Sequence, residues 1–475
     1  MRILILGAGQ VGTSLAEALA SEANDITVVD QDAQALALLA ERLDIRTVAG
    51  NASHPSVLRE AGIDDADLLV AVTQSDQTNL VACKIARSLF RVPTRIARLR
   101  SADYLDPAIL ANDNFAVDHA ICPEQEVTDY IAKMIEFPEA LQVVEFAGGR
   151  VVLVGLRAGA DGLLAGKPIR TLREHLPAGV DARIAAIFRN HRQIEPDGNT
   201  VVAPGDEVFL LAASGQIRRV LLELRKAPAP ARRVLIAGGG NIGARVAERL
   251  ERDYSVKLIE RNRGRAAAIA MQLSRTLVLS GDATDENLLT QENIDETDVF
   301  LALTNDDEDN IMAASLAKRL GCRRVLALIN RRAYADMVQG GPIDIALSPA
   351  QVSIGTLLTH VRRGDVARVH RLRRGAAEAL ELIAHGDAQT SQAVGRRIDQ
   401  LPKIGGARIA AIVRRAELGV LMPQVGVLRE AYPERVIIPH HDTVIESGDR
   451  VIVFCTHKRQ VKEVERLFQV AAGFL

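Results

Sequence analysis

Three closely spaced glycines near the start of the chain, and an aspartate after them, carry the clearest chemistry. Gly7, Gly9 and Gly12 lie between an apolar run and a helical pattern, and Asp30 ends the next apolar run. In that context the first glycine allows a tight turn, the second lets backbone approach a diphosphate, and the third permits close helix–strand packing. The helix starting near Val11 offers free N–H groups to phosphates. Because Asp30 can accept both ribose hydroxyls and repels a 2′-phosphate, we predict a site for NAD or an adenosine nucleotide.

The same pattern occurs again in the second half of the chain. Gly238, Gly240 and Gly243 repeat the spacing, and Glu260 ends the apolar run that follows. Glutamate can also hold a ribose, so we expect a second nucleotide site. Arg261, directly after this acid, leaves NADP or a triphosphate less firmly excluded there. A purely structural second copy is the alternative.

A loop beyond each glycine pattern adds a candidate for adenine recognition. In the second half Asp282 could accept from the exocyclic amine, and the first half has the uncharged Asn51 at that place. The two sites therefore need not share one affinity.

Two threonines follow later strands. Thr73 and Thr304 could touch ribose or adenine, because ligands of open α/β sheets bind at strand carboxyl ends. Helix capping by Ser75 or Asn305 explains those loops equally well.

The chain is an internal duplication with the order A-B-A′-B′. Self-similarity held over long segments indicates two copies of one pair of domains. An insertion at 415–440 in the last module is expected to be a surface loop. The matching segments are 7–12 and 238–243, 50–53 and 281–284, 71–79 and 302–310, 186–189 and 411–414, and 204–208 and 447–451.

Each A module alternates short apolar runs with helical patterns, which predicts a Rossmann-like, doubly wound parallel sheet. Each B module has strands around Pro/Gly turns, as in a small α+β domain. In the first A module we expect strands at 2–6, 25–30, 47–49, 68–72, 94–98 and 116–118, and helices at 11–21, 34–42, 55–61 and 77–90. In the first B module we expect strands at 143–146, 151–156, 182–188 and 207–212, and a helix at 216–225.

These patterns predict the domain boundaries. The arginine-rich run 362–374 is interpreted as a solvated linker helix, with a contact face for a membrane partner or for acidic lipid as the alternative. The expected segments are nucleotide-binding Rossmann-like domains at 1–120 and 232–350, connecting helices at 121–140 and 351–375, small α+β regulatory domains at 141–225 and 376–475, and a Pro/Ala linker at 226–231.

Composition excludes several classes of protein. The chain has 475 residues, 48% hydrophobic and 25% charged, with a net charge of −2, as in a globular protein of about three domains. With 3% aromatic residues, no Trp and no positive excess, we expect no nucleic-acid partner. The four cysteines lack metal or disulfide spacing and fit the core of a cytoplasmic protein. Glycines interrupt the apolar start, which we read as folded protein and not as a signal peptide.

No catalytic constellation is evident. A dehydrogenase needs a proton-transfer group beside its substrate, but we find no Tyr-x-x-x-Lys pair, no metal-ligand spacing and no hydrolase or Walker pattern. His54 is the best single acid–base candidate, and a solvated residue at a helix start is its ordinary interpretation. A duplicated nucleotide site without such groups favours a sensor. An NAD-dependent oxidoreductase acting on a small metabolite and a redox-sensing DNA-binding repressor are the alternatives.

Several motifs together resemble a known family. GAGQVG at 7–12, GNASHPSVLREA at 50–61, AVTQSD at 71–76, RIAR at 95–98, KLIER at 257–261 and NRRAY at 330–334 carry the resemblance. They resemble the cytosolic potassium-conductance-regulating domains of channels and transporters. The duplicated order is similar to the peripheral regulatory subunits of bacterial Trk potassium uptake, over essentially the whole chain.

The resemblance implies a function. In that family the A modules bind NAD(H) or adenine nucleotides such as ATP and ADP, and the B modules bind small ligands or dimerise. The homodimer or homotetramer docks on a Trk-type membrane potassium transporter subunit at the cytoplasmic face of the inner membrane. Asn51 departs from the acid expected at its position. The resulting nucleotide-binding candidates are Gly7, Gly9, Gln10, Val11, Gly12, Asp30, Asn51, Ala52, Thr73, Arg98, Gly238, Gly240, Asn241, Ile242, Gly243, Glu260, Asp282, Ala283 and Thr304; we expect no catalytic or metal-binding residue.

Overall fold

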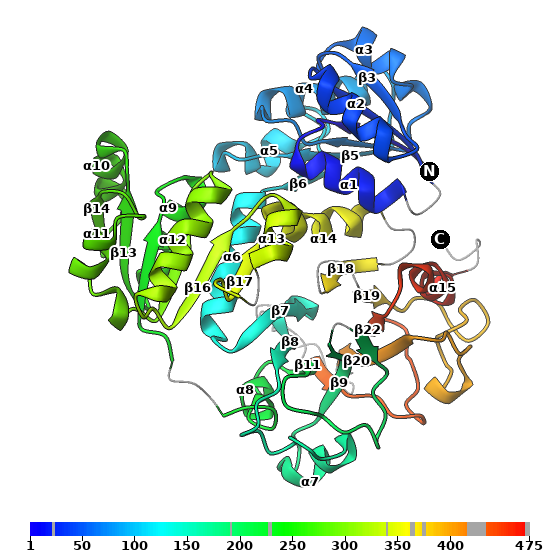
Figure 1. Ribbon diagram of the computed structural model, residues 1–475. Helices are drawn as coiled ribbons and strands as arrows, with labels where there is room; N and C mark the ends of the chain where they lie inside the picture. Colours follow the sequence, from blue (N-terminus) through cyan, green and yellow to red (C-terminus); the bar gives the residue numbers. More distant parts are fainter. Residues whose placement is uncertain are drawn as a thin grey trace, which may run out of the picture. The chain divides into compact units, whose positions relative to one another are not determined.

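The chain folds into two units, shown in Figure 1. Unit 1 comprises Met1–Ile135 and Ala231–Val361, and unit 2 comprises Glu136–Pro230 and Arg362–Leu475. Each unit therefore joins one module from each half of the chain. The computed structural model describes residues 1–20, 24–190, 192–226, 230–338, 341–361, 366–372, 377–415 and 434–470.

The first repeat of unit 1 is built on a six-stranded parallel sheet with the order β3-β2-β1-β4-β5-β6. The order reverses between β1 and β4, and a crevice for ligands opens at that point in doubly wound sheets. The strands are β1 (Arg2–Leu6), β2 (Asp25–Asp30), β3 (Arg46–Ala49), β4 (Leu68–Ala71), β5 (Thr94–Arg98) and β6 (His119–Ile121). The helices are α1 (Gln10–Ala20), α2 (Ala33–Arg42), α3 (Pro55–Glu60), α4 (Asp76–Ser88), α5 (Pro107–Leu110) and α6 (Pro123–Glu136).

The second repeat of unit 1 has the same topology, with the order β14-β13-β12-β15-β16-β17. All its strand pairs are parallel. The strands are β12 (Arg233–Ala237), β13 (Ser255–Glu260), β14 (Leu277–Ser280), β15 (Val299–Ala302), β16 (Arg324–Leu328) and β17 (Ile345–Leu347). The helices are α9 (Asn241–Leu250), α10 (Arg263–Gln272), α11 (Glu286–Gln291), α12 (Asp307–Arg319), α13 (Arg332–Val338) and α14 (Pro349–Val361).

The two repeats of unit 1 exchange their last helices. α14 of the second repeat contacts α1 and β6 of the first, and the rings of His119 and His360 stack with centroids 3.7 Å apart. In the other direction, Arg324 of β16 donates to the carbonyl oxygen of Met134 on α6 at 3.0 Å. In the same unit, residues of both glycine loops line one cavity.

Unit 2 contains two five-stranded antiparallel sheets of equivalent order, β10-β9-β11-β8-β7 and β18-β19-β22-β20-β21. Apolar side chains from both sheets form one hydrophobic core. The strands are β7 (Ala140–Phe146), β8 (Val151–Arg157), β9 (Ala182–Arg189), β10 (Arg192–Ile194), β11 (Glu207–Ala213), β18 (Val366–Leu372), β19 (Ala377–Ile383), β20 (Ala407–Arg415), β21 (Glu434–Ile437) and β22 (Arg450–Cys455). The helices are α7 (Leu172–His175), α8 (Ile217–Leu221) and α15 (Lys458–Phe468).

The predicted fold class is confirmed, including the duplication of both modules. The strand expected at 116–118 was misplaced, because Ala116 has a φ of +56° and the chain extends only at β6. The first B module contains one strand more than expected, β10. All four cysteines are buried, as predicted.

The helix expected over 351–375 was wrong in its second part. α14 ends at Val361, and residues 366–372 form strand β18, which pairs antiparallel with β19. Val366, Val369 and Leu372 are buried there, so a β-branched apolar face determined the structure and not the charge of the arginines. The end of the expected loop 415–440 is likewise a strand, β21.

Some sequence-based expectations fall on residues outside the described ranges. These are 227–229 of the linker, 362–365 in the arginine-rich run, 373–376 at its end and just beyond it, and 416–433 of the insertion. Among the described residues, every helix is either too short or too polar to traverse a lipid bilayer.

Candidate nucleotide-binding site

The first glycine loop connects β1 to α1 with the geometry that its sequence predicts. Gly7 has a φ of +111°, and a Cβ there would lie 3.0 Å from the backbone nitrogen of Thr73. A Cβ on Gly12 would lie 1.9 Å from the carbonyl oxygen of Gly7, so helix and strand approach too closely for any side chain. At Gly9, by contrast, no described atom lies within 4 Å of the Cβ position. The loop is therefore closely packed at Gly7 and Gly12, and it has open space at Gly9.

Asp30 is fixed against this loop. One carboxylate oxygen accepts the backbone N–H of Ala8 at 2.5 Å, and the other accepts that of Asp32 at 2.9 Å. Asp32 in turn caps α2 by accepting from the backbone nitrogens of Gln34 and Ala35. These bonds hold an acceptor-only group at the end of β2, where a ribose diol would donate to it.

The second repeat reproduces the loop. Gly238 has a φ of +101°, and a Cβ on Gly243 would lie 1.9 Å from the oxygen of Gly238. Glu260 accepts the backbone N–H groups of Gly239 and Asn262, each at 2.8 Å. The two halves therefore have the same phosphate-loop geometry.

The loops after β3 and β4 are largely occupied by their own hydrogen bonds. Asn51 uses its side-chain oxygen to accept from the backbone and hydroxyl of Ser53, at 2.9 and 2.8 Å. Thr73 donates its hydroxyl to Asn79 at 2.7 Å, and Ser75 caps α4 by accepting from Thr78. Helix capping by Ser75, one of the two interpretations of this loop, is therefore observed.

In the second repeat the cap differs from the expectation. Asp306, and not Asn305, caps α12 by accepting the backbone N–H of Asp309 at 2.8 Å. The hydroxyl of Thr304 donates to Asn310 at 2.8 Å, as Thr73 does to Asn79. Asn305 is therefore left beside the cap with its amide available.

Both glycine loops open into one cavity of about 810 Å³ within unit 1. Its wall brings together most of the first repeat's predicted residues and the loop of the second. The predicted residues in the wall are Gly7, Gly9, Gln10, Val11, Asp30, Ala52, Thr73, Arg98, Gly240, Asn241, Ile242 and Thr304. The predicted residues outside it are Gly12, Asn51, Gly238, Gly243, Glu260, Asp282 and Ala283.

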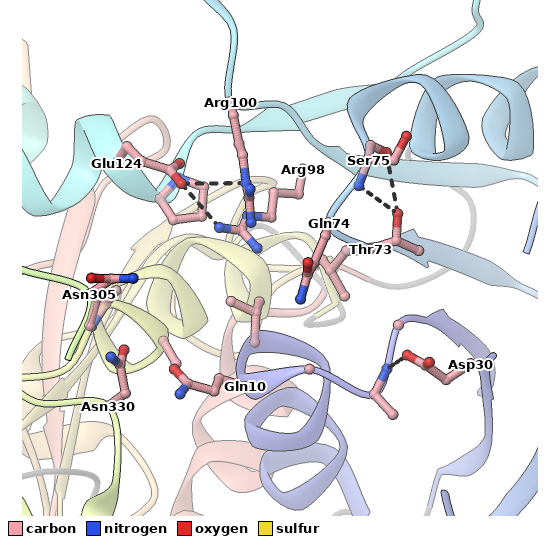
Figure 2. Close-up of a pocket in the computed structure, with 18 of the residues that line it drawn as sticks. Gln10, Asp30, Thr73, Gln74, Ser75, Arg98, Arg100, Glu124, Asn305 and Asn330 are labelled. Carbon is pink, nitrogen blue, oxygen red and sulfur yellow. Dashed lines mark hydrogen bonds and ion pairs between the residues drawn. The ribbon is translucent and has the colours of Figure 1, made fainter. Parts of the chain in front are cut away.

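Positive charge enters the cavity from the end of β5. A nitrogen of the Arg98 guanidinium lies 3.1 Å from the carboxylate of Glu124, and Nε of Arg100 lies 3.7 Å from the same oxygen (Figure 2). Burial lowers the pKa of Arg98, and the charge of Glu124 opposes that shift. Two cations that share one acid leave one unbalanced positive charge at this end of the cavity, which suits a ligand carrying phosphates.

Sequence reasoning missed several residues of the wall. Arg100 lies just beyond the predicted Arg98, and Glu124 is the second residue of α6. Gln74, Asn305 and Asn330 add neutral amides. Arg100 could have been found from its position beyond the end of a predicted strand, whereas Glu124 follows β6, the strand whose place was predicted wrongly.

His54 does not enter the cavity wall. It is exposed at the N-cap of α3 and makes no side-chain capping bond. This agrees with its ordinary interpretation as a solvated residue at a helix start.

The acids of the second repeat have partners of their own. Asp282 lies 2.6 Å from a guanidinium nitrogen of Arg261, and it also accepts from the backbone and hydroxyl of Thr284. The Thr284 backbone bond, followed by its hydroxyl and Arg261, lowers the pKa of Asp282. Arg265 donates to the carbonyl oxygen of Gly239 at 2.6 Å.

Two six-stranded parallel sheets, each with a glycine loop and an acid at the end of its second strand, define a tandem Rossmann-type protein. Family models agree with this class: the TrkA-N domain matches residues 3–123 and 234–349, and the TrkA-C domain matches residues 153–225. The chain belongs to the TrkA family of Trk system potassium uptake proteins. The resemblance found from its motifs is thereby confirmed.

Relatives cover the chain from end to end. It is 53% identical over 475 residues to the Trk system potassium uptake protein TrkA of Halomonas elongata, and 52% identical over 477 residues to that of Vibrio alginolyticus, with 100% of each chain covered. Among solved structures, the GsuK channel bound to NAD has a TM-score of 0.59 at 20% identity, covering 98% of this chain and 78% of that one. The crystal structure of the GsuK RCK domain has the same TM-score and identity, covering 98% and 94%. These structures share the fold.

Proposed function

We propose that this chain is a cytosolic regulatory subunit that binds NAD, NADH or an adenine nucleotide such as ATP or ADP. Binding in the unit 1 cavity then gates a Trk-type membrane potassium uptake transporter, on which the chain docks at the cytoplasmic face. The observation that carries the proposal is one cavity lined by an aspartate that can bind a ribose, by two glycine loops and by two arginines. Relatives named as Trk potassium uptake proteins, and a channel of the same fold bound to NAD, support it.

The ionisable groups of the wall favour a sensor over an enzyme. As formed by the described residues, the wall carries no His, Lys, Tyr or Cys. Asp32 is committed to capping α2, and Glu124 is paired with arginines. Asp30 then remains as an acceptor for sugar hydroxyls, and hydride transfer would need a further group to move the accompanying proton.

Small ligand differences suffice for regulation in an oligomer. Moving a two-state assembly from 1:99 to 99:1 takes about 5.5 kcal/mol of differential binding. In a homotetramer with one ligand per chain, that is about 1.4 kcal/mol for each ligand. One hydrogen bond or one changed phosphate contact is of this size. Exchange of NADH for NAD, or of ATP for ADP, would therefore be enough to switch the transporter.

The proposal is tested by calorimetry on the purified chain with NAD, NADH, ATP and ADP, together with potassium uptake by cells. The variant Asp30→Arg should lose nucleotide binding and uptake. The variant Asp44→Asn, at an exposed aspartate of the same repeat outside the cavity, should lose neither. Co-purification with a membrane potassium transporter should accompany both results. Absence of binding to all four nucleotides would refute the proposal, and steady NADH consumption with a small metabolite would point to an oxidoreductase instead.

A further inference from the structure

We infer that each chain binds a single nucleotide. The carboxylate of Asp30 in the first repeat binds its ribose, and residues of the second repeat form the opposite wall of the site. The inference rests on the proposed function and deepens it, because it fixes where the ligand sits and how many bind. It departs from the sequence-based expectation of one ligand per repeat.

The first argument is that both glycine loops share one space. Gly9 and Gln10 of the first repeat and Gly240 and Asn241 of the second line the same cavity, of about 810 Å³. Sites that hold one small molecule measure about 300–1,000 Å³. The cavity therefore has the size of a site for one dinucleotide.

The second argument is that the positive charge of the wall comes from one repeat. β5 ends at Arg98 and the equivalent strand β16 ends at Leu328, so Arg100 corresponds to Asn330. All four residues line the cavity, and only the first-repeat pair is cationic. Two diphosphates in this space would repel one another, with a single pair of arginines to neutralise them. One ligand on the first repeat meets no such conflict.

The third argument is that a side chain of the second repeat lies where a nucleotide would bind to that repeat's own glycine loop. Ala35 is the third residue of α2 and lines the cavity, whereas Arg265 is the third residue of α10. Arg265 donates Nε to the carbonyl oxygen of Gly239 at 2.6 Å and so lies across the glycine loop. A nucleotide on that loop would have to displace it.

The packing behind this loop differs as well. A Cβ on Gly239 would lie 2.4 Å from Cδ1 of the buried Ile269, so the loop is pressed against α10. The first repeat has Ala8 at the equivalent position, with space for its methyl group. The ion pair of Arg261 with Asp282 adds little, because its side chains are 65% and 40% exposed. Arg265 is itself exposed, so the pressed loop is the main obstacle.

The second repeat still contributes to the shared site. Figure 2 shows Asn305 and Asn330 on the side of the cavity away from Asp30. Their neutral amides can donate to or accept from the distal part of a bound nucleotide, the carboxamide of a nicotinamide or a terminal phosphate. The first repeat thus anchors the ligand, and the second repeat contacts its far end.

The test is isothermal titration of the full-length chain with ATP and with NADH, separately. We expect one ligand per chain for each. Asp30→Asn and Glu260→Gln form a matched pair, because each removes the charge of a carboxylate that accepts two backbone N–H groups. Asp30→Asn should weaken binding at least tenfold, and Glu260→Gln should change it less than twofold. Thermal melting of both variants establishes that each is folded.

A third variant, Asn305→Ala, tests the contribution of the second repeat and should weaken binding severalfold at unchanged stoichiometry. Two ligands per chain, or equal losses for Asp30→Asn and Glu260→Gln, would overturn the inference while leaving the proposed function intact. No heat with either nucleotide would overturn both. An unchanged affinity in Asn305→Ala would remove the far-wall contact and with it the shared site.

Discussion

The Arg98 guanidinium lies 3.1 Å from the Glu124 carboxylate, with the two groups coming from β5 and from the first turn of α6. Their side chains are only 14% and 10% exposed. The positive charge that faces the cavity therefore has a counter-ion supplied by the chain itself. Because a carboxylate and a phosphate bind a guanidinium in the same way, a nucleotide must compete with Glu124 for Arg98.

We predict that Glu124→Gln strengthens the binding of anionic nucleotides. Loss of the competing charge should tighten ATP binding by about tenfold at low salt, or about 1.4 kcal/mol, and make it more sensitive to salt. The same change should cost about 1–3 kcal/mol of folding stability, because the buried Arg98 loses its ion-pair partner. Calorimetry at two salt concentrations and urea unfolding measure the two effects.

A matched control is available on the same helix. Asp129 of α6 accepts from Gln125 at 3.1 Å and lies outside the cavity wall. Asp129→Asn removes one negative charge as well, but should leave nucleotide affinity unchanged. If Glu124→Gln instead weakened binding, the carboxylate would have to contact the ligand side directly, and the competition argument would be wrong.

The glycines of the first loop provide a second prediction. Gly9→Ala should leave stability within about 0.5 kcal/mol, because its methyl group enters open space. It should lower nucleotide affinity at least tenfold, since that space is where a diphosphate would meet the loop. Gly12→Ala should cost about 3 kcal/mol or more of stability, because its methyl group meets backbone at 1.9 Å.

The two glycine variants are each other's controls. Urea unfolding and nucleotide titration should separate them, with Gly9→Ala folded but deficient in binding and Gly12→Ala unstable. A Gly9→Ala protein that binds NADH and ATP normally would show that phosphates do not approach this loop.

Much of the fold follows from local pattern. Apolar runs such as 2–6 and 25–30, separated by helical patterns, form β1 and β2 because strands buried on both faces need continuous apolar sequence. Charge misled the sequence reading at Arg368 and Arg371, which lie on β18 and pair across to β19. The buried Val366 and Val369 determined that strand, but the arginines around them led to the prediction of a solvated helix.

The candidate site was predictable only within one repeat. Gly7, Gly9 and Asp30 are close in sequence and belong to one strand–loop–helix unit, so their arrangement follows from local rules. Asn305 and Asn330 of the second repeat line the same cavity, and no local pattern encodes that packing of one repeat on the other. Arg265 likewise donates a hydrogen bond to the carbonyl oxygen of Gly239, a contact that only the folded structure reveals.

Unit 2 provides a third prediction, from a repeated ion pair. Asp449 accepts two hydrogen bonds from Arg414, both at 2.8 Å, as Asp206 does from Arg189. Each aspartate is 1% exposed. Asp449→Asn should therefore lower the free energy of unfolding by about 2 kcal/mol, because charge-assisted bonds to a buried acceptor weaken. Urea unfolding measures the loss.

The equivalent variant, Asp206→Asn, should lose a similar amount. Glu195→Gln serves as the control, since Glu195 is 77% exposed and 3.9 Å from Arg408. It should change stability by less than about 0.5 kcal/mol. Equal stability in all three variants would show that the repeated pair contributes nothing beyond packing.

The last prediction concerns acid and the histidine of β18. His370 packs edge-on against Phe146, with ring centroids 5.0 Å apart, and its Nε2 has no hydrogen-bond partner among the described residues. Burial, assisted by the charge of Arg368, lowers the pKa of His370 from 6.5 to about 4. The unfolded chain therefore takes up a proton at higher pH than the folded chain does, and stability falls as pH drops from about 6.5 towards 4.

We expect this histidine to account for about 2 kcal/mol of the stability lost on acidification over that range. His370→Gln cannot take up the proton, so its loss between neutral and acid pH should be smaller by that amount, although it is less stable than the parent at neutral pH. His441→Gln replaces an exposed histidine of the same unit and should retain the parent's full pH dependence. Urea unfolding at several pH values distinguishes the two. Parallel pH profiles for the parent and His370→Gln would mean that His370 titrates alike in the folded and unfolded chain, and that burial against Phe146 does not hold it neutral.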